Sequence, residues 1–468
     1  YQTLAEPNKD DPQKLSPLLA RSWQQGETPH SLIFNLNPDA RFVSGNPVTA
    51  QDVIFSLTRA VKLNKAPSFI LGEFGWTPDN IDSQFTALND HQLEIRWPAQ
   101  IGQDLALRLL TAPVSSVVDS KTALQHASNN DTGNGWLKTH SAGSGAFSIK
   151  QFVPLQALVL EANPHAAPQP HLKRVLLKGV ADPGTRRLLV QQGDVDVAYQ
   201  LGPDQIAALK GKAGVKTEAY PMASLYYIQF NVGGNETLKN PALWEAARYL
   251  FDYKGIANDL LKGQFDVHQT FLPKGFLGAV NDTPYSYDPE KAKAILQKAG
   301  LTNVSFDLST SNQPPYLDIA QALQGSFAKG GVKINVQPGL SSEVSTSVKA
   351  HKYQATLNAW GADYFDPNSN TEAFCVNTDN TTAARNRTLA WRCGWSDDEF
   401  NQLTAQALHE SDPAQRLALY EKIQQLHREK SPFIFMMQQI QTTACAKSLS
   451  DVHMTVLEQW PYQQVKKA

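Results

Sequence analysis

The sequence lacks several features that would assign a function at once. Its 468 residues include only three cysteines. No stretch approaches the roughly 18–20 consecutive apolar residues that a membrane helix needs. The formal net charge is −2 and no basic block occurs, so the charge pattern of a nucleic-acid-binding protein is missing. We therefore expect a globular protein that neither spans a membrane nor binds nucleic acid.

Recognisable catalytic, cofactor and metal-binding motifs are also missing. Ser326 and Lys329 form an S-x-x-K pair, but no K-T-G follows, so a solvated helix face explains them better than a nucleophile. Ser144 lies in "AGSGAF", which is not the G-x-S-x-G of a nucleophile elbow. Neither a phosphate-binding glycine loop nor zinc-ligand spacing is found. We expect no catalytic residue, no cofactor and no metal site.

The three cysteines divide into a spaced pair and one apolar position. Cys375 and Cys393 flank a polar segment with few apolar residues to order it. A disulfide would stabilise such a loop by about 3 kcal/mol and would indicate an oxidising compartment. The alternative is two free thiols in a cytosolic loop. Cys445 lies in an apolar run and is expected to be a small buried residue.

The order of the expected elements indicates more than one domain, because a single core rarely grows beyond about 250–300 residues. Residues 1–230 mix helices and strands, as in "SLIFNLNP" and the helix after Thr49. After Asn231 the pattern changes to helices that alternate with strands, which favours βαβ units and a largely parallel sheet. Further strands follow residue 432, and a cleft between two such lobes is a common ligand site.

One stretch, "LNAWGADYFDPNSN" at 357–370, combines an apolar run with two acids and several aromatic rings. Asp363 could accept charge-assisted hydrogen bonds from an ammonium group, with Trp360 and Tyr364 adding apolar and cation–π contact. Equally, Asp363 could cap a turn. The residues alone leave both interpretations open.

Several segments together resemble extracellular solute-binding proteins of family 5, the peptide/nickel class. They are "LSPLLARSWQQG", "RFVSGNPVTAQDVIFSLTRAV", "SAGSGAFSI", "VQQGDVDVAY", "NPALWEAARYLFDYKGIANDLLKGQ", "DPEKAKAILQKAG" and "WGADYFDP". The resemblance runs from about residue 2 to 440. It implies a two-lobed periplasmic binding protein of type II, cluster C-like, mixing α/β and α+β lobes around a ligand cleft. The expected bounds are lobe I at 1–230 with an inserted subdomain near 30–140, lobe II at 231–439, and a return to lobe I at 440–468.

The resemblance also implies a function and a site. Such a protein is a monomer that is periplasmic or otherwise extracytoplasmic, in some cases lipid-anchored, and delivers a peptide or other small solute to a membrane ABC permease without catalysis. The aspartate of the matching motif, Asp363, would clamp a peptide amino terminus, with Trp360 and Tyr364 in the same pocket. Tyr226 and Tyr227, at the lobe crossing, would also line it. A loop disulfide in some members matches Cys375 and Cys393.

Two departures from the family pattern affect the expected ligand. Pro314 stands where dipeptide-binding relatives have an arginine for the ligand carboxylate, which favours oligopeptides over dipeptides. A segment of some thirty residues that usually precedes "YQTL" is missing, which suggests a trimmed or unusual chain. Alternative ligands are an opine, a sugar conjugate or a metal chelate. The alternative from another class is a secreted serine hydrolase.

Overall fold

The amino-terminal part of the chain forms a four-stranded antiparallel sheet with helices packed beside it. The computed structural model describes residues 1–384 and 386–468. The sheet order is β3-β4-β6-β5. Apolar side chains of this part form one cluster, here called the amino-terminal core, with buried members between Leu4 and Val117 and one distant member, Tyr364. The elements are β1 Ala5–Pro7, β2 Leu15–Pro17, β3 Ala20–Gln25, β4 Ser31–Leu36, α1 Ala50–Leu63, α2 Phe69–Gly72, β5 Phe85–Asn89, β6 Gln92–Arg96, α3 Gln103–Leu109 and α4 Ser120–Gln125.

Local sequence signals explain where the helices of this half begin and end. The backbone N–H of Thr49 donates to the carboxylate of Asp52 at 2.9 Å, so a capping box is present at the start of α1. In α5, Asp182 is the N-cap and Pro183 the first residue, and Gly193 ends the helix with a positive φ of 83°. The elements that follow α4 are β7 Phe147–Val153, β8 Ala157–Ala162, β9 Arg174–Lys178, α5 Pro183–Gln192, β10 Val197–Ala198 and α6 Pro203–Leu209.

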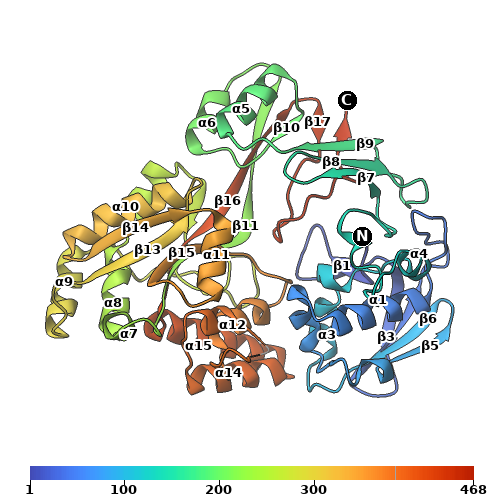
Figure 1. Ribbon diagram of the computed structural model, residues 1–468, viewed down its shortest axis with the longest axis horizontal. Coiled ribbons are helices and arrows are strands. Elements are labelled where there is room, and N and C mark those ends of the chain that lie inside the picture. The colour runs from blue at the N-terminus through green and yellow to red at the C-terminus, as the bar shows by residue number, and fades with distance from the viewer. Residues whose placement is uncertain (385) are drawn as a thin grey trace.

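Two long strands, β11 (Val215–Phe230) and β16 (Phe433–Ala446), connect the upper and lower parts of the molecule (Figure 1). We call them the crossing strands. They pair antiparallel from Val215 opposite Ala446 to Gln229 opposite Phe433. Their seven-stranded sheet has the order β10-β16-β11-β15-β13-β14, and β12 pairs with β16. One sheet therefore includes strands from both halves of the sequence.

The second half packs helices around this sheet. Among the described strands of this sheet, β13 alone makes parallel pairings, with β14 and β15. The pairings of the crossing strands with each other and with β10, β12 and β15 are antiparallel. The prediction of a largely parallel sheet is wrong because β16 returns beside β11 in the opposite direction. The elements are α7 Glu236–Lys239, α8 Pro241–Leu250, β12 Phe265–Val267, α9 Pro289–Lys298, β13 Ser305–Ser311, α10 Tyr316–Lys329, β14 Lys333–Gly339, α11 Ser341–Lys349, β15 Ala355–Trp360, α12 Pro367–Cys375, α13 Leu389–Arg392, α14 Asp398–His409 and α15 Pro413–Lys430.

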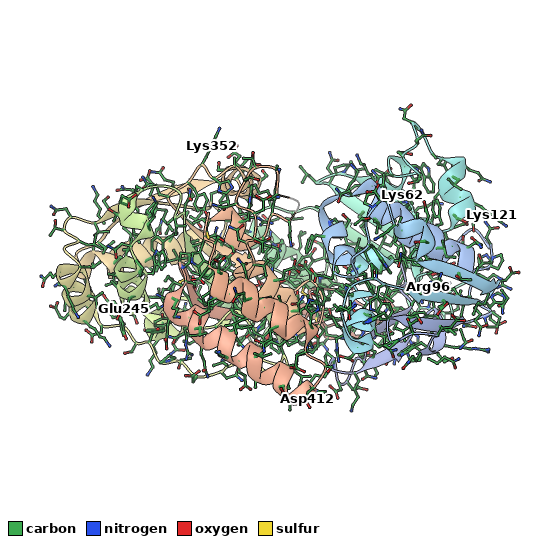
Figure 2. The ribbon with its side chains drawn as sticks, turned by 90° about the horizontal axis from the view of Figure 1, so that it is seen from below. Lys62, Arg96, Lys121, Glu245, Lys352 and Asp412 are labelled. Carbon is green, nitrogen blue, oxygen red and sulfur yellow. The ribbon has the colours of Figure 1, made fainter. Side chains whose placement is uncertain are left out.

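The remaining residues, 447–468, form what we call the returning segment, with the short pair β17 (Leu449–Ser450) and β18 (Lys466–Lys467). In Figure 1 it lies beside β7–β9, far from the helices that precede it in the chain. Charged side chains such as Glu245, Lys352 and Asp412 lie on the outside (Figure 2). Among the residues described, no helix combines the length and the apolar character needed to cross a membrane.

Candidate ligand-binding site

A cavity of about 1650 Å³ borders the crossing strands. Its walls come from β9, from α5 and α6, from the crossing strands, from the loop before α10 and from the returning segment. Tyr226 of β11 lines it, and so does Tyr316 at the start of α10. The two rings lie 5.0 Å apart between centroids. Segments far apart in the sequence thus enclose one space.

The end of β15 pairs with the part of β11 that carries the lining residues Ser224 and Tyr226, although neither Trp360 nor Asp363 is itself a lining residue. Trp360 pairs with Leu225 of β11 and is half-buried, and its indole Nε1 is buried without a partner among the described residues. The guanidinium of Arg392 lies 5.6 Å from the centre of the Trp360 ring. The ladder ends at Trp360, and Gly361, Ala362 and Asp363 follow it outside the sheet.

Asp363 is a half-buried carboxylate without an ion pair among the described residues. Its backbone N–H donates to Ser369 Oγ at 2.9 Å, which fixes the backbone and leaves the carboxylate free. Burial raises the pKa of Asp363 to about 6, the negative charge of Glu372 adds to this, and Arg392 partly opposes it. A carboxylate that is desolvated and lacks an ion pair favours a cationic partner.

The two tyrosines expected at the lobe crossing lie on opposite faces of β11. Tyr226 lines the cavity, whereas Tyr227 is fully buried against Phe374, Phe433 and Phe435 at centroid distances of 5.3, 5.8 and 5.5 Å. The reason is the two-residue period of a strand, which points neighbouring side chains to opposite faces. Only one of the pair can therefore face the cavity.

Tyr364 also points away from the cavity. It is 2% exposed and joins the amino-terminal core, and its hydroxyl accepts a hydrogen bond from Asn368 Nδ2 at 3.1 Å. Sequence reasoning had grouped it with Asp363 because the two are adjacent. The structure instead places it where the second half of the chain contacts the first.

Asp366 has the opposite environment to Asp363. It is 2% exposed, and both oxygens accept hydrogen bonds from Arg416 of α15, at 3.0 and 2.8 Å. Arg108 of α3 lies 4.0 Å from the same carboxylate and donates to the carbonyl of Phe365 at 3.2 Å. Asp366 also caps α12 through Asn368 N–H. This aspartate is therefore occupied within the fold.

The predicted disulfide is wrong, because Cys375 and Cys393 are both free, buried thiols. Cys375 ends α12, and Cys393 Sγ donates to the carbonyl of Ala390 at 3.3 Å. Burial raises the pKa of Cys393 to about 12. The loop is ordered instead by Trp391, whose Nε1 donates to Thr381 O at 2.9 Å. A buried indole thus replaces the expected covalent link, while Cys445 is buried as predicted.

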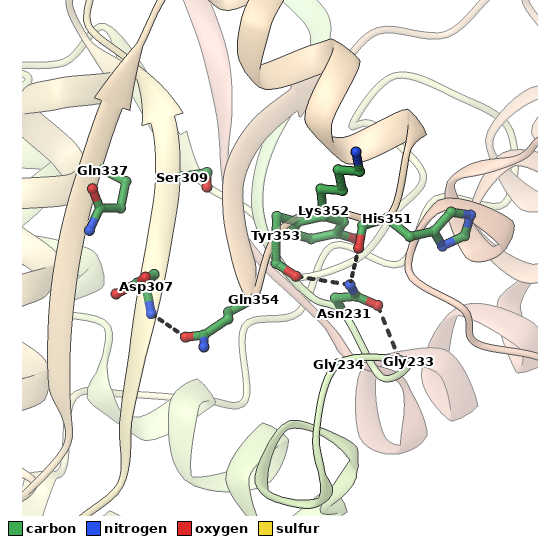
Figure 3. Close-up of a pocket in the computed structure, with 10 residues that line it drawn as sticks. All are labelled: Asn231, Gly233, Gly234, Asp307, Ser309, Gln337, His351, Lys352, Tyr353 and Gln354. Carbon is green, nitrogen blue, oxygen red and sulfur yellow. Dashed lines mark hydrogen bonds between the residues drawn. The ribbon is translucent and has the colours of Figure 1, made fainter.

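A second hollow, of about 520 Å³, lies beside β13–β15 (Figure 3). Its polar groups already bond to one another: Asn231 Nδ2 donates to Tyr353 O at 2.8 Å, and Gln354 Oε1 accepts from Asp307 N–H at 2.7 Å. All its walls belong to residues 231–354. A guest here would not contact the amino-terminal part or the returning segment.

Sequence reasoning missed Tyr316 and Glu458 as cavity residues. The segment "QPPY", whose tyrosine is the first residue of α10, was a usable signal for Tyr316, because in the resemblance it occupies the place of the ligand-contacting motif. No local pattern identified Glu458, which is contributed by the returning segment. Within the described part of the chain, no group of three or more His, Cys, Asp or Glu is arranged to hold a metal ion.

Comparison with known proteins supports the same architecture. The family described as bacterial extracellular solute-binding proteins, family 5, matches residues 14–382. A probable D,D-dipeptide-binding periplasmic protein, DdpA of Escherichia coli, is 28% identical over 448 residues, covering 94% of this chain and 83% of the relative. The Helicobacter pylori binding protein DppA, solved with the peptide STSA, superposes with a TM-score of 0.84 at 19% identity, over 100% of this chain and 92% of that one. AgaA of Agrobacterium tumefaciens R10, solved with agropinic acid, gives 0.79 at 21% identity, over 100% and 92%. These likenesses confirm the predicted fold class.

Proposed function

The chain belongs to the bacterial extracellular solute-binding proteins of family 5, and we propose that it captures a peptide, preferably an oligopeptide, for a membrane ABC permease. The family consists of solute-binding proteins that are not enzymes, in agreement with the sequence-based expectation. Members serve ABC importers and act outside the cytoplasm. The peptide, its length and the contacts that hold it are the parts we propose.

The observation that carries the proposal is the carboxylate of Asp363, which follows the end of β15, is partly desolvated and forms no ion pair among the described residues. An amino terminus is an ammonium group below a pH of about 8 and would supply the missing charge. In this arrangement Asp363 clamps the peptide amino terminus, Trp360 contributes its ring, and Tyr226 lines the space beyond. The relatives named for peptides are consistent with such a guest.

The size of the cavity favours an oligopeptide over a dipeptide. About 1650 Å³ exceeds the roughly 300–1,000 Å³ of common small-ligand pockets. Pro314 lines the cavity where a dipeptide binder would present an arginine, so a ligand carboxylate close to the amino terminus would lack that partner. Longer peptides, held by backbone hydrogen bonds, do not depend on it.

Capture would proceed by closure of two lobes, at 1–230 with 440–468 and at 231–439, about the crossing strands. A guest that contacts both lobes shifts the population toward the closed form by its extra affinity for that form. The protein is expected to act as a monomer, because the whole site is built from one chain.

Native mass spectrometry of freshly purified protein tests the proposal, because a retained guest is identified by its mass. A peptide mass is expected. An opine, such as the agropinic acid bound by AgaA, would instead assign a non-peptide solute. Calorimetry with the identified ligand then compares the wild type with Asp363→Asn, for which a loss of about 2–5 kcal/mol in binding free energy is expected. Asp398→Asn, at an exposed position of α14, is the matched control.

A further inference from the structure

The returning segment is held against β11 and presents one residue to the cavity. Ala223 N–H donates to Val456 O at 2.9 Å, and the hydroxyl of Tyr220 donates to Val452 O at 3.1 Å. A tight turn follows, in which Glu458 N–H donates to Thr455 O at 2.9 Å. The position of Glu458 is therefore set by the bonds that tie Val452 and Val456 to β11 and by the turn that follows them.

The carboxylate of Glu458 reaches across to the end of β15. A Cβ added at Gly361 would lie only 3.1 Å from Glu458 Oε1, so the lack of a side chain at 361 makes room for this approach. Gly361 is two residues before Asp363. The returning segment thus brings a second carboxylate to the same strand end as Asp363.

The surroundings of Glu458 supply hydroxyls and rings but no cation. Ser224, Tyr226 and Tyr316 line the cavity together with it. Burial raises the pKa of Glu458, and a hydrogen bond with Ser224 partly opposes this. No described residue forms an ion pair with Glu458. A partly desolvated carboxylate beside aromatic faces is an arrangement that attracts a cationic group.

Four of the five basic residues that line the cavity are occupied elsewhere, and the fifth, Lys178 of β9, forms no ion pair among the described residues. Lys262 pairs with Asp204 at 2.6 Å, and Lys467 pairs with Asp196 at 2.9 Å. Arg174 pairs with Glu161 at 2.7 Å, and Arg186 donates to backbone carbonyls, including that of Gln200 at 2.7 Å. None of these basic side chains forms an ion pair with Glu458 among the described residues, so a cationic group of the guest would complete its environment.

We infer that Glu458 is a specificity-determining residue that binds a second cationic group of the guest, close to its amino terminus. The inference rests on the proposed function, in which Asp363 holds the amino terminus itself. The substrate class is then peptides whose first side chain carries an amine or guanidine, as in lysine or arginine. Peptides whose first side chain is neutral are held at their amino terminus by Asp363 alone.

Calorimetry at pH 7 with two tripeptides tests this assignment. Lys-Ala-Ala and norleucyl-Ala-Ala have first side chains of similar length, but only lysine carries the ammonium group. The wild type is expected to bind Lys-Ala-Ala about tenfold more tightly. Glu458→Gln should remove this preference while leaving the affinity for norleucyl-Ala-Ala within about twofold. Glu421→Gln, at an exposed position of α15, is the matched control and should keep the preference.

A second variant provides an independent test if Glu458→Gln does not fold. Gly361→Ala places a methyl group against the Glu458 carboxylate without altering any charge, and is expected to reduce the preference partially. Equal binding of the two peptides by the wild type, with no effect of Glu458→Gln, overturns the inference and leaves the proposed function standing. Binding of neither peptide, with a non-peptide guest found by mass spectrometry, overturns both.

Discussion

Asp363 and Asp366 are three residues apart in one motif, yet their burial and their ion pairing are opposite. Asp366 is 2% exposed and held by two hydrogen bonds from Arg416. Asp363 is half-buried, has no ion pair among the described residues, and has a pKa raised to about 6 by burial. A paired carboxylate stabilises the scaffold, whereas an unpaired one is available to a ligand.

The comparison extends to the residues between them. Tyr364 packs into the amino-terminal core, and the carbonyl of Phe365 accepts a hydrogen bond from Arg108 of α3. In Figure 1, α12, α14 and α15 lie beside α3. Within the short stretch 363–366, the first residue thus belongs to the proposed ligand site. The other three residues form the contact between the two halves of the chain.

Asp366→Asn is expected to have the largest effect on folding. Asparagine also serves as an N-cap, so the change removes mainly the charge that compensates Arg416. Breaking a buried ion pair costs about 3–5 kcal/mol. Urea denaturation should show this loss in the free energy of unfolding. Asp363→Asn is the comparison variant, and a similar loss for both would contradict the assigned division of roles.

The pH dependence of ligand binding tests whether the carboxylate of Asp363 is available to the ligand. Its folded pKa lies above the ordinary 3.8, so the folded state favours the protonated carboxyl. The protonated carboxyl therefore stabilises the folded state fully below a pH of about 3.8, and this stabilisation is lost as the pH rises through about 6. A ligand ammonium needs the ionised form, so affinity should rise about tenfold from pH 5 to pH 7. Asp363→Asn should show a flat profile by calorimetry, and an equally flat wild-type profile would exclude this aspartate from the site.

A double-mutant cycle sharpens the description of Asp366. Arg416 lies 2.8 Å from its carboxylate and Arg108 lies 4.0 Å away. We expect a coupling energy of about 1–3 kcal/mol for Arg416→Ala with Asp366→Asn, and a smaller one, below about 1 kcal/mol, for Arg108→Ala. Denaturation of the single and double variants gives both values. A larger coupling for Arg108 would mean that the contact between the halves, rather than α15, holds this carboxylate.

The smallest effect concerns the other end of α12, the helix that Asp366 begins. Cys375 ends this helix as a free thiol, so a reducing agent should leave the free energy of unfolding unchanged. Thiol titration should find all three cysteines in the unfolded protein and little reaction in the native one, because burial raises the pKa of the thiols. Detection of a single thiol after unfolding would instead show that Cys375 and Cys393 form the disulfide.

Much of the local structure could be predicted because its causes lie within a few residues. Thr49 with Asp52, Asp182 with Pro183, and Asp288 with Pro289 all begin helices as their spacing indicates. The spacing of Ser396 and Glu399 would predict a capping box at the start of α14, but Asp397 caps the helix instead and Ser396 bonds to Asn377 O. That competing partner is 19 residues away and leaves no local trace.

By itself, the sequence determined the helix boundaries, the family and the location of the acidic, aromatic motif, since these follow from short-range spacing and motif order. The tertiary structure alone decided which aspartate is neutralised, which tyrosine faces the cavity, and that two cysteines stay apart. Charge compensation and burial depend on groups brought together in space: Arg416 reaches Asp366 across 50 residues, and Glu458 approaches Gly361 from the far end of the chain.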